Sequence, residues 1–296
     1  MTYLVGYGPR NDDRSAIELA AQFARAHPAP VVAVAVVPRG WGTPAAAGTD
    51  REYEEWAASE GQSTAELARA DFARHPGLVG DAIWTPGRSV PATLLEQADE
   101  RDASMIVVGS AAEADPGRVR LTSKTDRLVH SSTLPVAIAP RGYRTTSSVT
   151  RVTVGFRDDD ASWSLLTRVA ELVREVGARL RVVTFIVTPA APVTNSVTHA
   201  QTQVIELWSM QATAALREAE EYLRSLDLGV DLEFHVAAGV DWPAAVAAAG
   251  WEDGDVLVVG SSSTHRLAQV FLGSSASKIL RSSPVPVVIV PGARAD

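Results

Sequence analysis

A long internal repeat constrains this chain more than any other feature. The segment MIVVGS at 105–110 recurs as VLVVGS at 256–261, and SSTLPVAIAP at 131–140 recurs as SSPVPVVIVP at 282–291. The same offset of 151 residues (256 minus 105, and 282 minus 131) aligns both pairs. A repeat of this length indicates two copies of one structural unit, so we expect each half to fold and to act as a unit of its own.

The length fits two domains. A half of about 150 residues can bury a core of its own, and a chain of 296 residues is near the size at which one core divides into two. We predict one domain over residues 1–141 and a second over 150–296. The segment between them, RGYRTTSSV at 141–149, is short and polar and is predicted to be a linker.

The alternation of short β-branched runs with longer helical patterns predicts the fold class. It is typical of βαβ units and of a parallel sheet that is covered on both faces. We therefore predict an α/β protein made of two tandem, doubly wound, five-stranded parallel-sheet domains. The predicted strands are 3–7, 31–37, 82–84, 105–109 and 136–139 in the first half, and 152–156, 180–187, 230–236, 256–260 and 287–290 in the second. The predicted helices are 13–26, 53–74, 90–100 and 123–130, and 161–176, 203–226, 242–249 and 274–281.

Composition excludes several classes of function. The 27 Lys and Arg residues against 35 Asp and Glu give a net charge of −8, and no basic cluster resembles those that bind phosphate backbones, so nucleic acid is not an expected partner. The chain has no cysteine, which excludes disulfides, thiolate metal sites and cysteine nucleophiles. The six histidines lack the spacing of metal ligands, so no metal is expected.

Targeting and catalytic motifs are also missing from the sequence. The beginning, MTYLVGYGPRNDD, does not resemble a signal peptide, and no apolar run approaches the about 20 residues that span a bilayer, so we expect a cytoplasmic protein with no membrane partner. No Walker loop, GxGxxG fingerprint or GxSxG elbow is present. The sequence therefore favours a protein that is not an enzyme.

A candidate ligand site follows the repeated VVGS segment of the second half. Ligands of an open parallel sheet bind beyond the carboxyl ends of its strands, and here a polar loop leads to Gly273-Ser274-Ser275 at the start of a helix. Glycine lets the backbone approach a phosphate closely, and the N–H groups that follow are donors at the positive end of a helix dipole. Serine is also a common helix cap, so a cap and a polar turn explain the same residues without a ligand.

Both halves resemble universal stress protein (UspA-type) domains over nearly their full length. The resemblance rests on the VVGS segment, the Gly-Ser at the last helix of the second half and the PVPVVIVP ending. It implies a Rossmann-like, adenine nucleotide alpha hydrolase-like fold and a non-catalytic stress-response or regulatory function. Members of the family that hold ATP carry a G-x-x-G-x₉-G-[S/T] loop after the fourth strand and an aspartate after the first.

The second half keeps part of that nucleotide loop. Ser263 stands where the family has its second glycine, and Arg157 stands at the position of the aspartate. The acidic triplet 158–160 that follows is predicted to cap a helix rather than to bind a metal. The resemblance implies ATP or AMP as the ligand, with no metal required. It places the candidate nucleotide site at Gly260, Ser261, Ser263, Gly273, Ser274 and Ser275.

The first half departs further from the family pattern. Its degenerate counterpart consists of Gly109, Ala112, Thr122 and Ser123, with Gly8 at the aspartate position. The segment Asp-Pro-Gly at 115–117 interrupts the loop. A Cβ at Thr122 is expected to strain any positive φ that a glycine would adopt there, by about 1 kcal/mol or more. We predict that this half does not hold a nucleoside triphosphate in the family manner.

The last strand of each half is a candidate interface. An edge strand exposes unpaired N–H and C=O groups, so we expect the two copies to pair as a pseudo-dimer through Val136 and Ile138 in one half and Val287 and Ile289 in the other. The resemblance implies the same, because single-domain members dimerise through this strand. A homodimer of the whole chain is a further possible partner. Trp56 and Trp208, on the second helix of each half, are the tryptophans that we expect at a binding mouth or an interface.

Two alternative functions stay open at this point. The first is a weak ATPase, which would need a positioned base and a Mg²⁺ carboxylate, and the triplet 158–160 is its candidate. The second is a protein-interaction scaffold that has lost its ligand.

Overall fold

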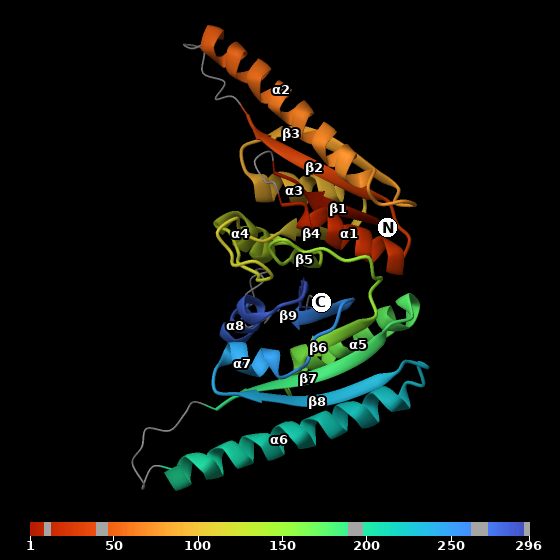
Figure 1. The fold of residues 1–296 in the computed structure, drawn as a ribbon, viewed down its shortest axis with the longest axis vertical. Helices are drawn as coiled ribbons and strands as arrows, with labels where there is room; N and C mark the ends of the chain where they lie inside the picture. Colours follow the sequence, from red (N-terminus) through yellow and green to blue (C-terminus); the bar gives the residue numbers. More distant parts are fainter. Residues whose placement is uncertain (9–12, 40–46, 189–197, 262–271, 293–296) are drawn as a thin grey trace. The chain divides into compact units, whose positions relative to one another are not determined.

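The chain forms two compact units in a computed structural model, Met1–Thr146 and Ser147–Asp296. The structure describes residues 1–8, 13–39, 47–188, 198–261 and 272–292 (Figure 1). The division between the units lies inside the segment 141–149 that we predicted to be a linker.

The first part of that segment is attached to the first unit. The backbone N–H of Gly142 donates to the carboxylate of Asp13 at 3.2 and 3.3 Å. The N–H of Tyr143 donates to Ser15 Oγ at 2.8 Å, and its hydroxyl donates to Gln22 Oε1 at 2.8 Å. Residues 142 and 143 are therefore fixed on a helix of their own unit rather than forming a free connection.

Each unit is an open parallel sheet with the strand order of a doubly wound fold. In the first unit every strand pair is parallel and the order is β3-β2-β1-β4-β5. In the second unit it is β8-β7-β6-β9-β10, again parallel throughout. The fold class predicted from the sequence is thus confirmed for both halves. The strands are β1 (Thr2–Gly6), β2 (Val31–Pro38), β3 (Gly80–Gly87), β4 (Ala103–Gly109), β5 (Val136–Ala139), β6 (Arg151–Gly155), β7 (Arg179–Val187), β8 (Leu232–Gly239), β9 (Asp255–Gly260) and β10 (Val287–Val290).

The helices cover each sheet in pairs. Helix α1 packs on α2 and α3 packs on α4, and α5 with α6 and α7 with α8 repeat this arrangement. Right-handed crossovers place the two pairs on opposite faces, since the strand order reverses between β1 and β4 and between β6 and β9. The helices are α1 (Ser15–Ala26), α2 (Ala47–Phe72), α3 (Val90–Asp99), α4 (Ser123–Ser131), α5 (Asp160–Val176), α6 (Thr198–Ser225), α7 (Trp242–Ala247) and α8 (Ser274–Ser282). No helix in the described part of the chain is long and apolar enough to span a bilayer.

Several boundaries and one helix cap differ from the sequence prediction. The strand predicted at 82–84 spans Gly80–Gly87, and the one predicted at 230–236 spans Leu232–Gly239. Helices α2 and α6 begin at residues 47 and 198, six and five residues before the predicted starts. Asp241 caps α7 by accepting from Ala244 N at 2.8 Å, as its sequence context suggests. Ser89, at the matching position before α3, makes no side-chain cap.

The residue directly after the first strand makes different contacts in the two units. In the first unit Tyr7 donates its hydroxyl to Asp71 at 2.9 Å, and Arg14 pairs with the same buried carboxylate at 2.9 Å. In the second unit Phe156 follows β6 as Tyr7 follows β1, and here the contacts are aromatic: the ring centroids of Phe156 and Trp163 lie 5.2 Å apart, and those of Trp163 and Tyr222 lie 5.7 Å apart, both pairs edge to face. The same fold therefore accommodates a hydrogen-bonded ion pair after the first strand of one unit and packed aromatic rings after the first strand of the other.

A buried ionic network closes the amino end of the second sheet. Arg151 donates to both oxygens of Asp255, at 2.9 and 2.6 Å, and Arg181 donates to Thr153 Oγ1 at 3.0 Å. Burial opposes the charge on Arg151, but the hydrogen bonds and the attraction to Asp255 outweigh it and raise the pKa of Arg151. Burial, and then repulsion from Arg151, lower the pKa of Arg181, whose guanidinium lies 4.9 Å from the ring centre of Trp251.

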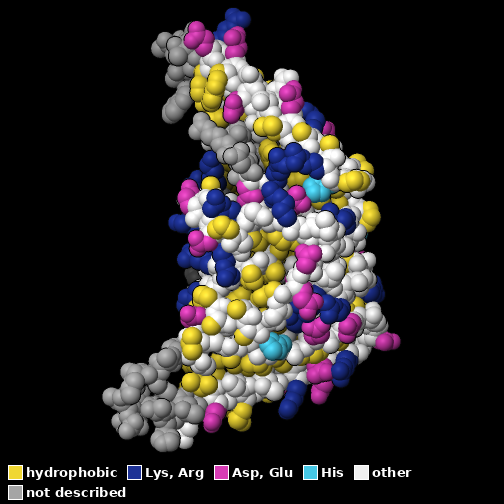
Figure 2. Space-filling model, viewed as in Figure 1, with side chains coloured by type: hydrophobic (Ala, Val, Ile, Leu, Met, Phe, Trp, Pro, Cys, Tyr) yellow, Lys and Arg dark blue, Asp and Glu magenta, His cyan; other side chains and the backbone are white. Residues whose placement is uncertain are grey.

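Charge is mixed on the outside. On the face shown in Figure 2, dark blue and magenta side chains are interspersed, so basic residues do not collect into a stripe there.

We expect Asp255→Asn to destabilise the second unit by about 3–5 kcal/mol, because it removes the buried carboxylate that lies against both guanidinium groups and leaves Arg151 only the more exposed Glu233 and Glu252, each at 3.5 Å. Urea unfolding followed by tryptophan fluorescence measures the change. The matched control is Ser104→Ala, at the same position of the first unit, where the hydroxyl donates only to Thr2 O at 3.3 Å. A shift of less than 1 kcal/mol for Asp255→Asn would show that the network does not hold this end of the sheet.

Candidate functional site

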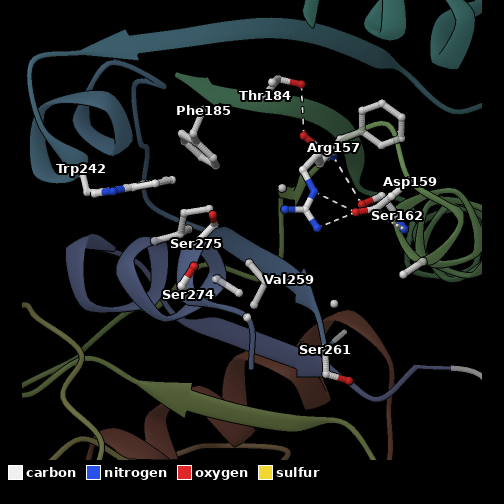
Figure 3. Close-up of a pocket in the computed structure, with 17 residues that line it drawn as sticks. Arg157, Asp159, Ser162, Thr184, Phe185, Trp242, Val259, Ser261, Ser274 and Ser275 are labelled. Carbon is white, nitrogen blue, oxygen red and sulfur yellow. Dashed lines mark hydrogen bonds and ion pairs between the residues drawn. The ribbon is translucent and has the colours of Figure 1, made fainter. Parts of the chain in front are cut away.

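A cavity of about 190 Å³ lies in the second unit at the carboxyl ends of β6, β7 and β9 (Figure 3). It is at the point where the strand order reverses, which is where open α/β sheets bind ligands. The first turns of α5, α7 and α8 complete its wall. The lining residues are Gly155, Phe156, Arg157, Asp159, Ala161, Ser162, Thr184, Phe185, Trp242, Val259, Gly260, Ser261, Gly273, Ser274, Ser275, Ala276 and Ile279.

The cavity has an aromatic side and a charged side. Figure 3 shows Phe185 and Trp242 on one side, Arg157 with Asp159 on the other, and Ser275 between them. The ammonium group of Lys278, one turn along α8, lies 5.7 Å from the ring centre of Trp242. Flat apolar groups and a negatively charged group can thus be contacted from different sides of one space.

The start of α8 has no side-chain cap. The residue before the helix is Gly273, which has no side chain that could accept from the first turn. The first intrahelical bond runs from Ser277 N to Gly273 O at 2.9 Å. The N–H groups of the first turn of a helix have no partner within the helix, and they carry its positive partial charge. With the hydroxyls of Ser274 and Ser275, which line the cavity, they form a set of donors that an anion can bind.

The structure brings together five of the six candidate residues. Gly260, Ser261, Gly273, Ser274 and Ser275 all line the cavity, whereas Ser263 lies outside the described residues. The Ser261 hydroxyl is buried and accepts from the backbone N–H of Gly292 at 3.0 Å. This serine therefore holds the segment after β10 in place as well as contributing to the wall.

The acidic triplet caps α5, as predicted. Asp159 accepts from Ser162 N at 2.9 Å and pairs with Arg157 at 2.6 and 2.8 Å, while Asp158 accepts from Trp163 Nε1 at 2.9 Å. Burial would raise the pKa of Asp159, but the bonds from Ser162 and the attraction of Arg157 outweigh it and lower that pKa. Among the described residues, no three His, Asp or Glu side chains are grouped so that they could hold a metal ion.

The first unit has a cavity of about 230 Å³ at the matching place. Gly109 and Thr122 line it, whereas Ala112 and Ser123 are exposed and do not. Thr122 caps α4 with its own hydroxyl, which accepts from Thr125 N at 3.0 Å. The side chain that replaces Gly273 thus occupies the place where an anion would accept from the first turn.

The prediction of backbone strain at Thr122 is wrong. Thr122 has φ −79° and ψ 162°, and Gly273 has φ −58° and ψ 157°, so both residues are extended and neither needs a positive φ. The two sites differ because threonine brings a capping hydroxyl, and glycine does not.

The loop before α4 is closed on itself. Arg118 N donates to Asp115 O at 3.0 Å across a turn in which Gly117 has φ +72°. Arg120 N donates to Ser110 Oγ at 2.7 Å, and Arg141 Nη1 donates to Ala114 O at 2.8 Å. The Asp-Pro-Gly segment therefore builds a self-bonded turn.

Sequence reasoning missed the aromatic wall. Phe185 and Trp242 were not predicted as site residues, although each stands directly at the carboxyl end of a strand or at the helix start that follows one, which is the available signal. Trp56 and Trp208, which we expected at a binding mouth or interface, lie on α2 and α6, each 49% exposed, and line neither described cavity.

Comparison with known proteins gives consistent results. A family model described as "Universal stress protein family" matches residues 1–140 and 148–291. The chain is 37% identical over 296 residues to universal stress proteins of Mycobacterium tuberculosis and Mycobacterium bovis, covering 99% of this chain and all of each relative. Among solved structures, a universal stress protein from Archaeoglobus fulgidus aligns over 98% of both chains with a TM-score of 0.69 at 16% identity. A putative universal stress protein from Pseudomonas aeruginosa aligns over 98% of this chain and 93% of its own, with a TM-score of 0.59 at 16% identity.

Proposed function

The chain belongs to the universal stress protein family, and we propose that it is a non-catalytic stress-response or regulatory module whose second domain binds an adenine nucleotide. The observation that carries this proposal is the uncapped first turn of α8, which faces a cavity beside two serine hydroxyls. The first domain closes the matching turn with Thr122, so binding is asymmetric.

The chemistry of the walls supports a nucleotide. The donors of Gly273, Ser274 and Ser275 suit phosphate oxygens, and the positive end of α8 favours their charge. Phe185 and Trp242 offer flat apolar surfaces to a base or a ribose face. The described cavity of about 190 Å³ is smaller than the 300–1,000 Å³ usual for ligands of drug size, so these residues enclose part of the nucleotide.

The acidic residues near the cavity support a function without turnover. Asp159 is held by Ser162 and Arg157, and Asp158 by Trp163, so both carboxylates already serve the start of α5. A general base or a Mg²⁺ ligand has to reach the γ-phosphate or its attacking water. These two carboxylates would have to leave their present partners to do so.

We expect Gly273→Thr to lower ATP or AMP affinity at least about tenfold, because the new hydroxyl caps α8 as Thr122 caps α4 and takes the place of a phosphate oxygen. The backbone at Gly273 already has angles that threonine adopts at 122, so the fold is retained. Isothermal titration with each nucleotide measures the dissociation constant, and thermal unfolding checks the fold.

The matched control is Thr122→Val, which removes the cap of α4 and costs about 1 kcal/mol of stability without changing nucleotide affinity. Equal losses of affinity in the two variants would contradict the asymmetry. Unchanged affinity in Gly273→Thr would contradict the site itself.

Phosphate release from ATP with Mg²⁺ is expected to stay at the level of a no-protein blank over hours. A coupled phosphate assay on the full chain measures it, with Asp158→Asn as the comparison. Sustained release that disappears in Asp158→Asn would establish the ATPase alternative instead.

We further propose that the two domains associate as a pseudo-dimer through the last strands, which carry Val136, Ile138, Val287 and Ile289. Within its own unit, each of β5 and β10 pairs along one edge only among the described strands, with β4 and β9 respectively. An edge strand that stays open invites association, and pairing two such edges satisfies both.

Small-angle scattering of the full chain tests this association. The pseudo-dimer predicts a distance distribution with a single maximum that does not change between 0.1 and 1 M salt, because a strand pair does not depend on surface charge. A distribution with two separate maxima, as for beads joined by a flexible linker, would contradict it.

A further inference from the structure

We propose that the cavity of the first domain binds a small organic monoanion with an apolar body, such as an aromatic carboxylate, independently of the nucleotide site of the second domain. The cavity of about 230 Å³ lies at the carboxyl ends of β1, β2 and β4, against α3 and α4.

Aliphatic side chains make most of the wall. Val36 in the first domain occupies the position of Phe185 in the second. Gly6 lies opposite Val34 as Gly155 lies opposite Val183, and Val36 and Phe185 each come two residues later. Val90 likewise holds the place of Trp242, each the first residue of its helix. Valine at both positions means that this cavity lacks the two aromatic rings that line the cavity of the second domain. The aliphatic residues that line it are Val34, Val36, Val90, Leu94, Val108 and Leu128.

The side-chain hydroxyls that line the wall next to α4 and after β1 are already bonded within the protein. Ser110 Oγ accepts from Arg120 N at 2.7 Å, and Thr122 Oγ1 accepts from Thr125 N at 3.0 Å. The hydroxyl of Tyr7 donates to Asp71 at 2.9 Å. A phosphate that accepted from the N–H of Thr125 would have to displace the hydroxyl of Thr122, whereas an apolar group would leave that bond intact.

One charge remains at the rim. Lys124 is the charged residue among the described lining side chains, it is exposed, and no carboxylate in the described part of the chain pairs with it. Ser275 holds the matching place in the second domain. A ligand that matches this cavity therefore has an apolar body, to contact the aliphatic wall, and a single negative charge, to contact Lys124.

The volume sets the size of the ligand. A cavity of about 150 Å³ lined by aliphatic side chains is sufficient for benzene. The about 230 Å³ found here holds one ring with a short acidic side chain, which makes phenylacetate a suitable probe.

The experiment titrates phenylacetate into the full-length protein and follows methyl signals by NMR. Binding in the first domain shifts the methyl groups of Val34, Val108 and Leu128 and leaves those of Val259 and Ile279, in the other cavity, unchanged. Benzyl alcohol, which has a ring and no charge, is expected to bind about fivefold more weakly than phenylacetate.

Three variants separate the contributions. Val36→Phe places the aromatic residue of the second domain in this cavity and is expected to abolish the shifts, and the fold accepts phenylalanine at this register, as Phe185 shows. Lys124→Met removes the charge and should lower the affinity for phenylacetate about fivefold, while the affinity for benzyl alcohol stays unchanged. Arg127→Met is the control, because it removes an exposed cation of α4 that does not line the cavity.

Two results would overturn the proposal. One is the absence of shifts at Val34, Val108 and Leu128 at 20 mM phenylacetate. This concentration is roughly the highest dissociation constant expected for a ligand of this size with a good fit. The other is equal weakening in Lys124→Met and Arg127→Met, which would show an unspecific charge effect. Titration with ATP in the same samples reports on the second domain separately, so failure of the nucleotide site does not affect this outcome.

Discussion

The unmet peptide N–H groups in the first turn of the last helix are the constraint on which the chemistry of each domain depends. A helix that starts at the ligand edge of a parallel sheet must satisfy these donors with a side chain, with water or with a ligand. In the first domain Thr122 satisfies one of them from within. In the second, Gly273 leaves the whole turn to whatever enters the cavity. A difference of one side chain, with no positive φ at either residue, thus changes what the site can accept.

Around this turn the two domains keep the same scaffold and exchange its side chains. The strand order and the point of reversal are identical, so both cavities lie at the same place. The second domain has aromatic residues at Phe185 and Trp242, where the first has two valines. The amino end of the second sheet carries the pair of Arg151 and Asp255, which is distant from the ligand edge and concerns stability alone. The two domains therefore share one frame and differ in the side chains at the ligand edge.

Much of the fold could be predicted from the sequence, because the repeat and the β-branched runs report directly on buried parallel strands. The candidate loop could be placed for the same reason, and Gly260, Gly273 and Ser274 do line one cavity. The aromatic wall could not, because Phe185 and Trp242 belong to different strand and helix ends that only the folded sheet brings together. The effect of Thr122 was also beyond the sequence, because strain at a positive φ and a capping hydroxyl are both consistent with a threonine at this position, and only the backbone angles distinguish them.

Hydrogen exchange of the full chain with and without ATP tests the asymmetry most directly. A phosphate bound at α8 would slow exchange of the amides at 274–276, because they would donate to it, and would leave the amides at 123–125 unchanged. Equal protection of both helix starts, or of neither at saturating ATP, would contradict the account.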